Sequence, residues 1–437
     1  MIPALTPSEW QWCAHLSSSL AGLLLILPLY GLARCFYSIR TAWLGTLLFI
    51  MLPVVVQTTT DALSESWYLL FLFGALWTLV HGVRSQRSSW FVMTGLLSGA
   101  AYLVRIEAVV LPAAVGVWTL LSRWHVHKPL PSGCCVRNLG ILAVCFVLPP
   151  LPYMVTIGKL SNRPVMQTIA NNSEINFTDN DVLFASHRLQ DGVDGIRRAA
   201  VKWSEALWLV TSSLGRAGHF LIWPFAGLGM FILWRTRRSD PALLLLISLC
   251  VLYGAMLLRL AFTSGYATER HTLTLVALAA QTAALGLIAV AQWLRRTLVH
   301  ARWGRHLTAL LGLGMIAICL PKDVQPLHRN QEGHRQAGLW LEHHLEYADQ
   351  LVDPYRWASY YAGLVFQTRP TATLTSRVLG IVDPQETDLN RQHDWQAAGL
   401  QSQEATTVWC WPSAQHPKVL IRATRPTQTA QRHEAGR

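Results

Sequence analysis

The stretch that decides the fold runs from Trp90 to Ser122 and reads WFVMTGLLSGAAYLVRIEAVVLPAAVGVWTLLS. Apart from a few small polar residues it is apolar, and it is interrupted near its middle by Arg105 and Glu107. Basic residues flank both of its ends, which places both ends on the same side of a membrane. The stretch then crosses twice, in arms of about 15 residues that are each roughly 22 Å long as helix. Since a hydrocarbon core is about 30 Å thick, Arg105 and Glu107 should form a hairpin tip below the membrane surface.

Apolar runs of the length of a transmembrane helix, about 20 residues, lie on both sides of this hairpin. They occupy 15–36, 41–59, 64–83, 139–157, 217–234, 241–261, 272–294 and 306–321. With the two arms of the hairpin, the sequence predicts an all-α polytopic membrane domain of ten spans over residues 1–321.

The composition also indicates a membrane protein. Only 14% of the 437 residues are charged and 52% are hydrophobic, whereas soluble domains carry about 25% charged residues. The 19 Trp also indicate a membrane protein, because the amphipathic tryptophan ring favours the level of the lipid headgroups. These values exclude an ordinary cytosolic enzyme, a disordered chain and a disulfide-rich secreted scaffold.

The basic residues are gathered on one side of the expected spans, which accounts for much of the net charge of +12 without a nucleic-acid partner. Short loops on that side contain a single acid, Asp240, beside Arg34, Arg40, Arg84, Arg87, Arg123, Lys128, Arg137, Arg235, Arg237, Arg238, Arg295, Arg296, Arg302 and Arg305. Short loops rich in Lys and Arg stay in the cytoplasm. The sequence therefore predicts a multi-pass membrane protein whose N-terminus and C-terminal domain are exoplasmic.

An exoplasmic N-terminus without a basic cytoplasmic anchor is typical of a chain that has lost an earlier helix. The alternative is a protein whose N-terminus is natively outside.

Ionisable groups inside a membrane domain are functional candidates, because each costs several kcal/mol unless it is paired or hydrated. Asp61 and Glu65 are four residues apart at the start of one span and are expected to share a helical face. The alternative for Asp61 is a helix N-cap. Arg105 and Glu107 either line a cavity or form an ion pair that holds the hairpin tip.

Further polar residues are expected on the same side. Tyr266, Arg270 and His271 lie at the mouth of another span, where an arginine offers a bidentate fork to phosphate. The alternative is a solvated loop in which Thr268 or Glu269 caps the helix. Lys159 adds positive potential or serves as an interfacial anchor. Together these groups suit a reaction in which a carboxylate deprotonates an acceptor and cations hold a phosphate leaving group.

Other motifs are weak. The sequence has no P-loop, no Gly-x-Gly-x-x-Gly, no His-Glu-x-x-His and no Gly-x-Ser-x-Gly. A divalent cation is possible as a cofactor, but no complete ligand set is visible.

The soluble parts are an outer loop over 158–205, with an amphipathic helix over 195–204, and an α/β domain over 322–424. The second is expected to contain helices over 332–346 and 355–362 and strands over 350–352, 406–411 and 419–423. The polar tail 425–437 is expected to be disordered.

Several segments between residues 15 and 365 resemble the GT-C glycosyltransferases, in particular the protein O-mannosyltransferase and lipid A aminoarabinose transferase type. These segments are Ser17–Arg34, Thr60–Glu65, Gly95–Glu107, 152–164, Tyr266–His271, Gly338–Trp340 and Tyr360–Gly363. The resemblance implies a helical membrane domain in a bacterial inner membrane that moves a sugar from a polyprenyl-phosphate carrier to a protein, lipid or glycan acceptor on the exoplasmic face.

The resemblance also implies roles for residues. The family's leading carboxylate lies in a first outer loop, and the matching segments of this chain begin after that point. Asp61 matches the second outer-loop acid, and Arg105 with Glu107 matches an Arg-x-Glu hairpin.

The resulting hypothesis is a polyprenyl-phosphate-sugar-dependent glycosyltransferase. Asp61 acts as base or as a ligand of metal or acceptor, with Glu65 and Glu107 as further catalytic candidates. Arg105, Lys159, Tyr266, Arg270 and His271 are the substrate-binding candidates. The alternatives are a polytopic transporter and an inactive, truncated glycosyltransferase homologue.

Overall fold

The computed structural model describes residues 7–125, 132–158, 192–238, 240–264, 267–297, 306–324, 332–346, 349–354, 357–364, 377–384 and, with short gaps, 395–424. By its contacts the chain divides into two compact units. One is the helical unit, Ala14–Gln325, and the other comprises Met1–Cys13 with Pro326–Arg437.

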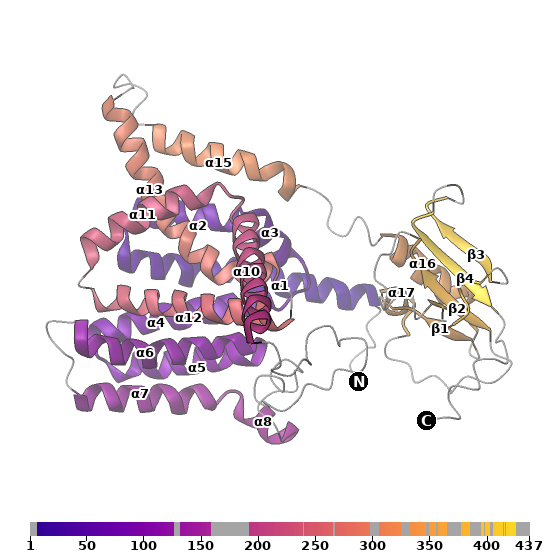
Figure 1. Ribbon diagram of the computed structural model, residues 1–437, viewed down its shortest axis with the longest axis horizontal. Coiled ribbons are helices and arrows are strands. Elements are labelled where there is room, and N and C mark those ends of the chain that lie inside the picture. Colours follow the sequence, from indigo (N-terminus) through magenta and orange to yellow (C-terminus); the bar gives the residue numbers. More distant parts are fainter. Residues whose placement is uncertain are drawn as a thin grey trace. The chain divides into compact units, whose positions relative to one another are not determined.

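Helices lying side by side form the helical unit (Figure 1). Their bounds are α1 Pro7–Phe36, α2 Ile39–Ile50, α3 Pro53–Thr60, α4 Glu65–Ser85, α5 Ser88–Val104, η1 Ile106–Val109, α6 Val110–His125, α7 Ser132–Val147, α8 Leu151–Ile157, α10 Gly192–Ala217, α11 Ile222–Arg237, α12 Pro241–Ser264, η3 Glu269–Thr272, α13 Leu273–Thr297 and α15 Leu307–Asp323. The expected hairpin is confirmed: α5 and α6 are two short apolar arms, and the helix breaks at Arg105, whose backbone is extended.

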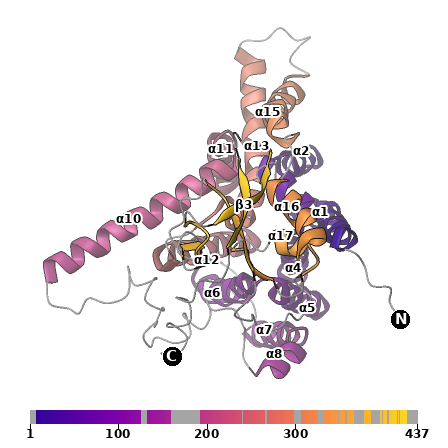
Figure 2. The same cartoon turned by 90° about the vertical axis from the view of Figure 1, so that its right-hand side faces the viewer.

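Several of the expected spans are bent. Four helices of the described residues are long and apolar enough to cross a membrane, or seven if each bent pair counts as one span. The bent pairs are α2 with α3 at 66°, α7 with α8 at 52°, and the later part of α10 with α11 at 96°. With the two short arms, the number of spans is close to the ten expected. Figure 2 shows α10 extending away from the neighbouring helices, so the expected short helix over 195–204 is part of a much longer one.

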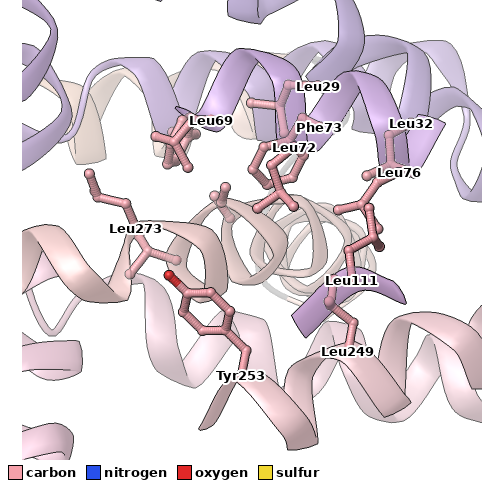
Figure 3. Packing of buried hydrophobic residues seen from close by; sticks show 14 of the residues in the cluster. Leu29, Leu32, Leu69, Leu72, Phe73, Leu76, Leu111, Leu249, Tyr253 and Leu273 are labelled. Carbon is pink, nitrogen blue, oxygen red and sulfur yellow. The ribbon is translucent and has the colours of Figure 1, made fainter. Parts of the chain in front are cut away.

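The core of this unit is a continuous cluster of apolar side chains around α4 (Figure 3). Leu69, Leu72, Phe73 and Leu76 of α4 are all at most 1% exposed. They meet side chains of the same cluster from other helices, including Leu29 and Leu32 of α1, Leu111 of α6, Leu249 and Tyr253 of α12, and Leu273 of α13. Because α4 is apolar on nearly every face, it is buried by neighbouring helices that pack against it from several sides. The position of Glu65 at the start of α4 is therefore fixed by the packing of the whole helix.

The pair α11 and α13 comes unusually close. A Cβ added at Gly229 would collide with the carbonyl oxygen of Thr282, and one added at Gly286 would collide with the carbonyl oxygen of Phe225. Small residues allow such backbone approach between membrane helices. In contrast, a Cβ at Gly227, half a turn from Gly229 on the same helix, would have no heavy atom within 4 Å.

We therefore expect Gly229→Ala to destabilise the helical unit by about 1–3 kcal/mol, the usual cost of overpacking, because the clash is with backbone atoms that cannot rotate away. Gly227→Ala is the matched control and should be neutral or stabilising by less than about 1 kcal/mol. Thermal unfolding of the two variants in detergent checks this. Equal melting temperatures for the two variants would contradict the close packing of α11 and α13.

The C-terminal unit contains a four-stranded sheet of order β1-β2-β4-β3. Its elements are α16 Glu332–His344, β1 Gln350–Val352, α17 Trp357–Tyr361, β2 Val378–Val382, β3 Thr406–Trp411 and β4 Val419–Thr424. β1 pairs with β2 in parallel, and β4 pairs antiparallel with both β2 and β3. The expected helix over 332–346 and the three expected strands are confirmed within two residues of their ends.

The central strand β2 was missed. Its five residues, Val378–Val382, are all buried, so the strand lacks the alternation of apolar and polar residues that marks a half-exposed strand. Next to it, Arg377 forms a 2.7 Å ion pair with Asp349. Hydrogen bonding to Asp349 raises the pKa of the Arg377 guanidinium above its usual value, and the pair joins the residues that directly precede β1 and β2.

Candidate functional site

Charged side chains from distant parts of the helical unit meet at one end of the bundle. Glu65 is the first residue of α4, Arg105 occupies the break between α5 and η1, and Arg270 lies in η3 before α13. We call this group, with Glu107 of η1, the carboxylate–arginine cluster. The other end of α4 carries Arg84, which donates a hydrogen bond to the carbonyl oxygen of Cys35 at the end of α1 and forms an ion pair with Asp240 before α12. The two ends of the bundle thus carry different sets of charged groups.

Arg105 is the centre of the cluster. Its Nη1 donates to Glu65 Oε1 at 2.6 Å, and its Nη2 and Nε donate to Glu107 Oε1 at 2.8 and 3.2 Å. The extended backbone at Arg105 (φ −147°, ψ 132°) interrupts the helix here, and Glu107 follows in the short helix η1. Arg105 and Glu107 form an ion pair at this break, which is one of the two alternatives that the sequence left open for the hairpin tip.

The ion pairs of Arg105 are almost completely removed from solvent. The side chains of Arg105 and Glu65 are 10% and 5% exposed, and that of Glu107 is 17% exposed. The guanidinium of Arg105 also lies 5.8 Å from the ring centre of Tyr68, one turn after Glu65 on α4, within the range of a cation–π contact. A buried charge is tolerated only when it is paired and hydrogen-bonded, and Arg105 meets both conditions.

Arg270 is the more exposed cation of the cluster. Its Nε lies 3.8 Å from Glu65 Oε1, and its side chain is 41% exposed. The Nδ1 of the neighbouring His271 takes part in a capping box with the N-cap residue Thr268. The carbonyl oxygen of His271 accepts a 3.1 Å hydrogen bond from Tyr253 of α12. The turn that carries Arg270 is therefore held at both ends, and the capping role expected for Thr268 is confirmed.

Two expectations about Asp61 are wrong. It neither caps the start of a span nor shares a helical face with Glu65, because α3 ends at Thr60 and α4 begins only at Glu65. Asp61 is instead the C-cap residue of α3, with its N–H donating to the carbonyl oxygen of Gln57. The four-residue spacing was misread because the chain leaves the helix between the two acids. Asp61 remains partly exposed at the same end of the bundle as Glu65.

Lys159 and Tyr266 lie outside the described residues, so the structure does not place them. Among the residues that it does describe, no three His, Cys, Asp or Glu side chains form a group that could hold a metal ion. The described residues therefore offer no ligand set for the divalent cation considered from the sequence.

Sequence reasoning missed the pairing of Glu65 with Arg105, which are 40 residues apart. It also missed Tyr68 and Tyr253 beneath the cluster and the 3.4 Å pair of Arg216 with Glu269 beside it. The sequence did contain a signal for the pairing of Glu65 with Arg105. Two acids and one arginine inside an apolar domain require either a second cation or one arginine that pairs with both acids. The sequence pattern does not distinguish the two tyrosines from the other buried apolar residues of their helices.

Comparisons with known proteins agree with this architecture. Residues 4–153 match the model of the family described as dolichyl-phosphate-mannose-protein mannosyltransferase. This part of the chain contains Asp61, Glu65, Arg105 and Glu107. No sequence among the curated proteins matches the chain significantly.

Among solved structures, ArnT from Cupriavidus metallidurans in the apo state superposes with a TM-score of 0.54 at 15% identity, over 95% of this chain and 84% of that chain. The oligosaccharyltransferase of Archaeoglobus fulgidus superposes more loosely. Its complex with Zn and sulfate gives a TM-score of 0.46 at 13% identity, over 82% of this chain and 50% of that chain. The ArnT superposition shows a common fold for nearly the whole chain.

Over its first third the chain is thus similar to the dolichyl-phosphate-mannose-protein mannosyltransferase family, and over almost its full length it has the fold of ArnT.

Proposed function

We propose that the chain is a glycosyltransferase that moves a sugar from a polyprenyl-phosphate carrier to a protein, lipid or glycan acceptor. The observation that carries this proposal is the carboxylate–arginine cluster, in which Arg105 is buried between two carboxylates while Arg270 is half exposed beside them. The matching family's name, which contains a dolichyl-phosphate sugar, supports the class of donor.

The reaction assigns a separate task to each group. An acceptor hydroxyl attacks the anomeric carbon of the donor sugar, the bond from that carbon to the phosphate oxygen breaks, and polyprenyl phosphate leaves. Asp61 takes the proton of the hydroxyl as general base. Arg270 binds the phosphate, on which negative charge increases as the bond breaks. Glu65 and Glu107 hold Arg105 and thereby position η3 and the hairpin tip around the substrate.

The orientation of the chain is part of the proposal. The bundle end that carries Arg84 and the neighbouring basic loops is proposed to face the cytoplasm. The carboxylate–arginine cluster and the C-terminal domain are then exoplasmic, in the inner membrane of a bacterium. No nucleic acid takes part.

The role of Arg270 is tested by Arg270→Gln. We expect KM for a polyprenyl-phosphate sugar to rise roughly 10- to 100-fold, the loss of a hydrogen bond to a charged group, with a smaller change in kcat. The matched control is Arg216→Gln, which removes the same charge from a 54% exposed side chain near the cluster and should change KM less than about threefold. Equal effects of the two variants on KM would show that Arg270 does not contact the phosphate.

A further inference from the structure

A large apolar cavity lies between four helices of the helical unit, away from the carboxylate–arginine cluster. It encloses about 470 Å³ and is lined from α1, α11, α12 and α13, a volume within the range of ligand pockets, about 300–1,000 Å³. The lining is almost entirely hydrocarbon, with Phe36 and Leu32 of α1, Leu233 of α11 and Leu243 of α12 as buried walls. Such a lining suits a hydrocarbon chain and offers little to a polar substrate.

The cavity opens sideways from the bundle. Phe231 and Trp234 of α11 and Val251 of α12 line it and are 62%, 50% and 64% exposed. α12 is among the helices long and apolar enough to span a membrane, and Val251 lies near its middle. The opening is therefore continuous with the hydrocarbon of the bilayer, and a lipid chain can enter without crossing water.

At one end of the cavity, arginines lie next to its lining residues. Its lining reaches Tyr37, whose carbonyl oxygen accepts a 2.9 Å hydrogen bond from Arg34. It also reaches Trp234, which is followed directly by Arg235 and, two residues later, Arg237, both exposed. The nearby acid Asp240 is neutralised by Arg84 at 2.6 Å. The mouth thus carries a net positive charge at the bundle end where α1 and α11 finish and α12 begins.

We infer that this cavity binds one anionic glycerophospholipid of the leaflet at the arginine-rich end. An acyl chain fills the apolar space, and Arg34, Arg235 and Arg237 bind the phosphate. Basic pockets between membrane helices on the cytoplasmic side are suited to anionic headgroups. The lipid would fill the space between α1 and the α11–α12 hairpin, where side chains alone leave a void. This inference concerns a site separate from the proposed reaction and does not depend on it.

The test uses the full chain, purified in detergent and titrated with dioleoyl phosphatidylglycerol or dioleoyl phosphatidylcholine, with bound lipid counted by native mass spectrometry. Val251→Trp and Met230→Trp fill the cavity from its exposed side, where folding tolerates a large side chain. Leu27→Trp is the control, because Leu27 is also exposed on α1 (65%) and does not line the cavity. The triple variant Arg34→Gln, Arg235→Gln, Arg237→Gln tests the headgroup site, with Arg216→Gln as a charge control at the other end of the bundle.

The expected result is one phosphatidylglycerol per chain, bound at least tenfold more tightly than phosphatidylcholine. Both cavity-filling variants should weaken this binding tenfold or more, and Leu27→Trp should not. The triple variant should weaken phosphatidylglycerol binding roughly 100-fold, about fivefold per arginine, and weaken phosphatidylcholine binding much less, because the choline cation offsets the attraction between the arginines and its phosphate. The inference is overturned if the two lipids bind equally, if both cavity-filling variants retain phosphatidylglycerol, or if added polyprenyl phosphate displaces phosphatidylglycerol from the wild-type chain at equal concentration.

Discussion

Arg105→Leu is expected to destabilise the helical unit by about 3–5 kcal/mol, the usual cost of removing one partner from a buried ion pair. The substitution would leave Glu65 and Glu107 facing the space of the lost guanidinium, with side chains only 5% and 17% exposed. Arg270, at 3.8 Å from Glu65, compensates one of the two charges at most. Loss of the folded peak in size-exclusion chromatography, or a melting temperature lower by many degrees, is the expected measurement.

Two further variants separate charge from packing. In the double variant Arg105→Leu, Glu107→Gln, one uncompensated charge is gone, so part of the lost stability should return. Arg216→Leu, the control, breaks the exposed pair with Glu269, whose side chains are 54% and 32% exposed, and should cost less than about 1 kcal/mol. If Arg105→Leu melts like the wild type, the buried ion pairs do not hold the hairpin tip to α4.

Asp61→Asn has the largest expected effect on activity. The amide has nearly the same shape as the carboxylate but cannot accept the acceptor's proton, so kcat should fall about 100- to 10,000-fold. Stability should change little, because Asp61 is partly exposed and lies at the end of α3 rather than within a helix. The measurement is the rate of sugar transfer, with the melting temperature and the affinity for the carrier determined on the same preparation.

Glu65→Gln is the informative comparison for this variant. Glu65 is buried and paired with Arg105, so its replacement should lower the melting temperature as well as the rate. A rate for Asp61→Asn equal to that of the wild type would rule out Asp61 as the base. If only Glu65→Gln lost activity without losing stability, the base would have to be assigned to Glu65.

Much of the membrane domain could be predicted from the order of apolar and charged residues. The hairpin of 90–122 was predicted because two short arms and two charged residues within them allow few other arrangements. The bends within the membrane spans were harder to predict. Pro53 at the start of α3 and Pro149 and Pro150 before α8 are local signals for two of them. The 96° turn before α11 contains His219 and Phe220, which adopt positive φ angles. The sequence pattern does not predict this conformation.

The individual residues of the candidate site could be predicted from the sequence, but most of the contacts between them could not. Arg105 and Glu107 are near neighbours in sequence, so their pairing was an open alternative. The contact of Arg105 with Glu65 depends on how α4 packs against α5, and that of Arg270 with Glu65 depends on η3 reaching the start of α4. Such contacts follow from tertiary packing. Asp61 shows the opposite case, where a helical spacing was assumed across residues that are not helical.

The measurement that tests the central claim most directly is sugar release from a labelled polyprenyl-phosphate hexose by the purified chain in liposomes. The account predicts saturable release of hexose to an acceptor or to water, with polyprenyl phosphate as the second product, and a loss of this release in Asp61→Asn. A chain that neither binds the carrier nor releases sugar, and instead moves a small solute across the liposome membrane, would contradict the glycosyltransferase account and favour a transporter.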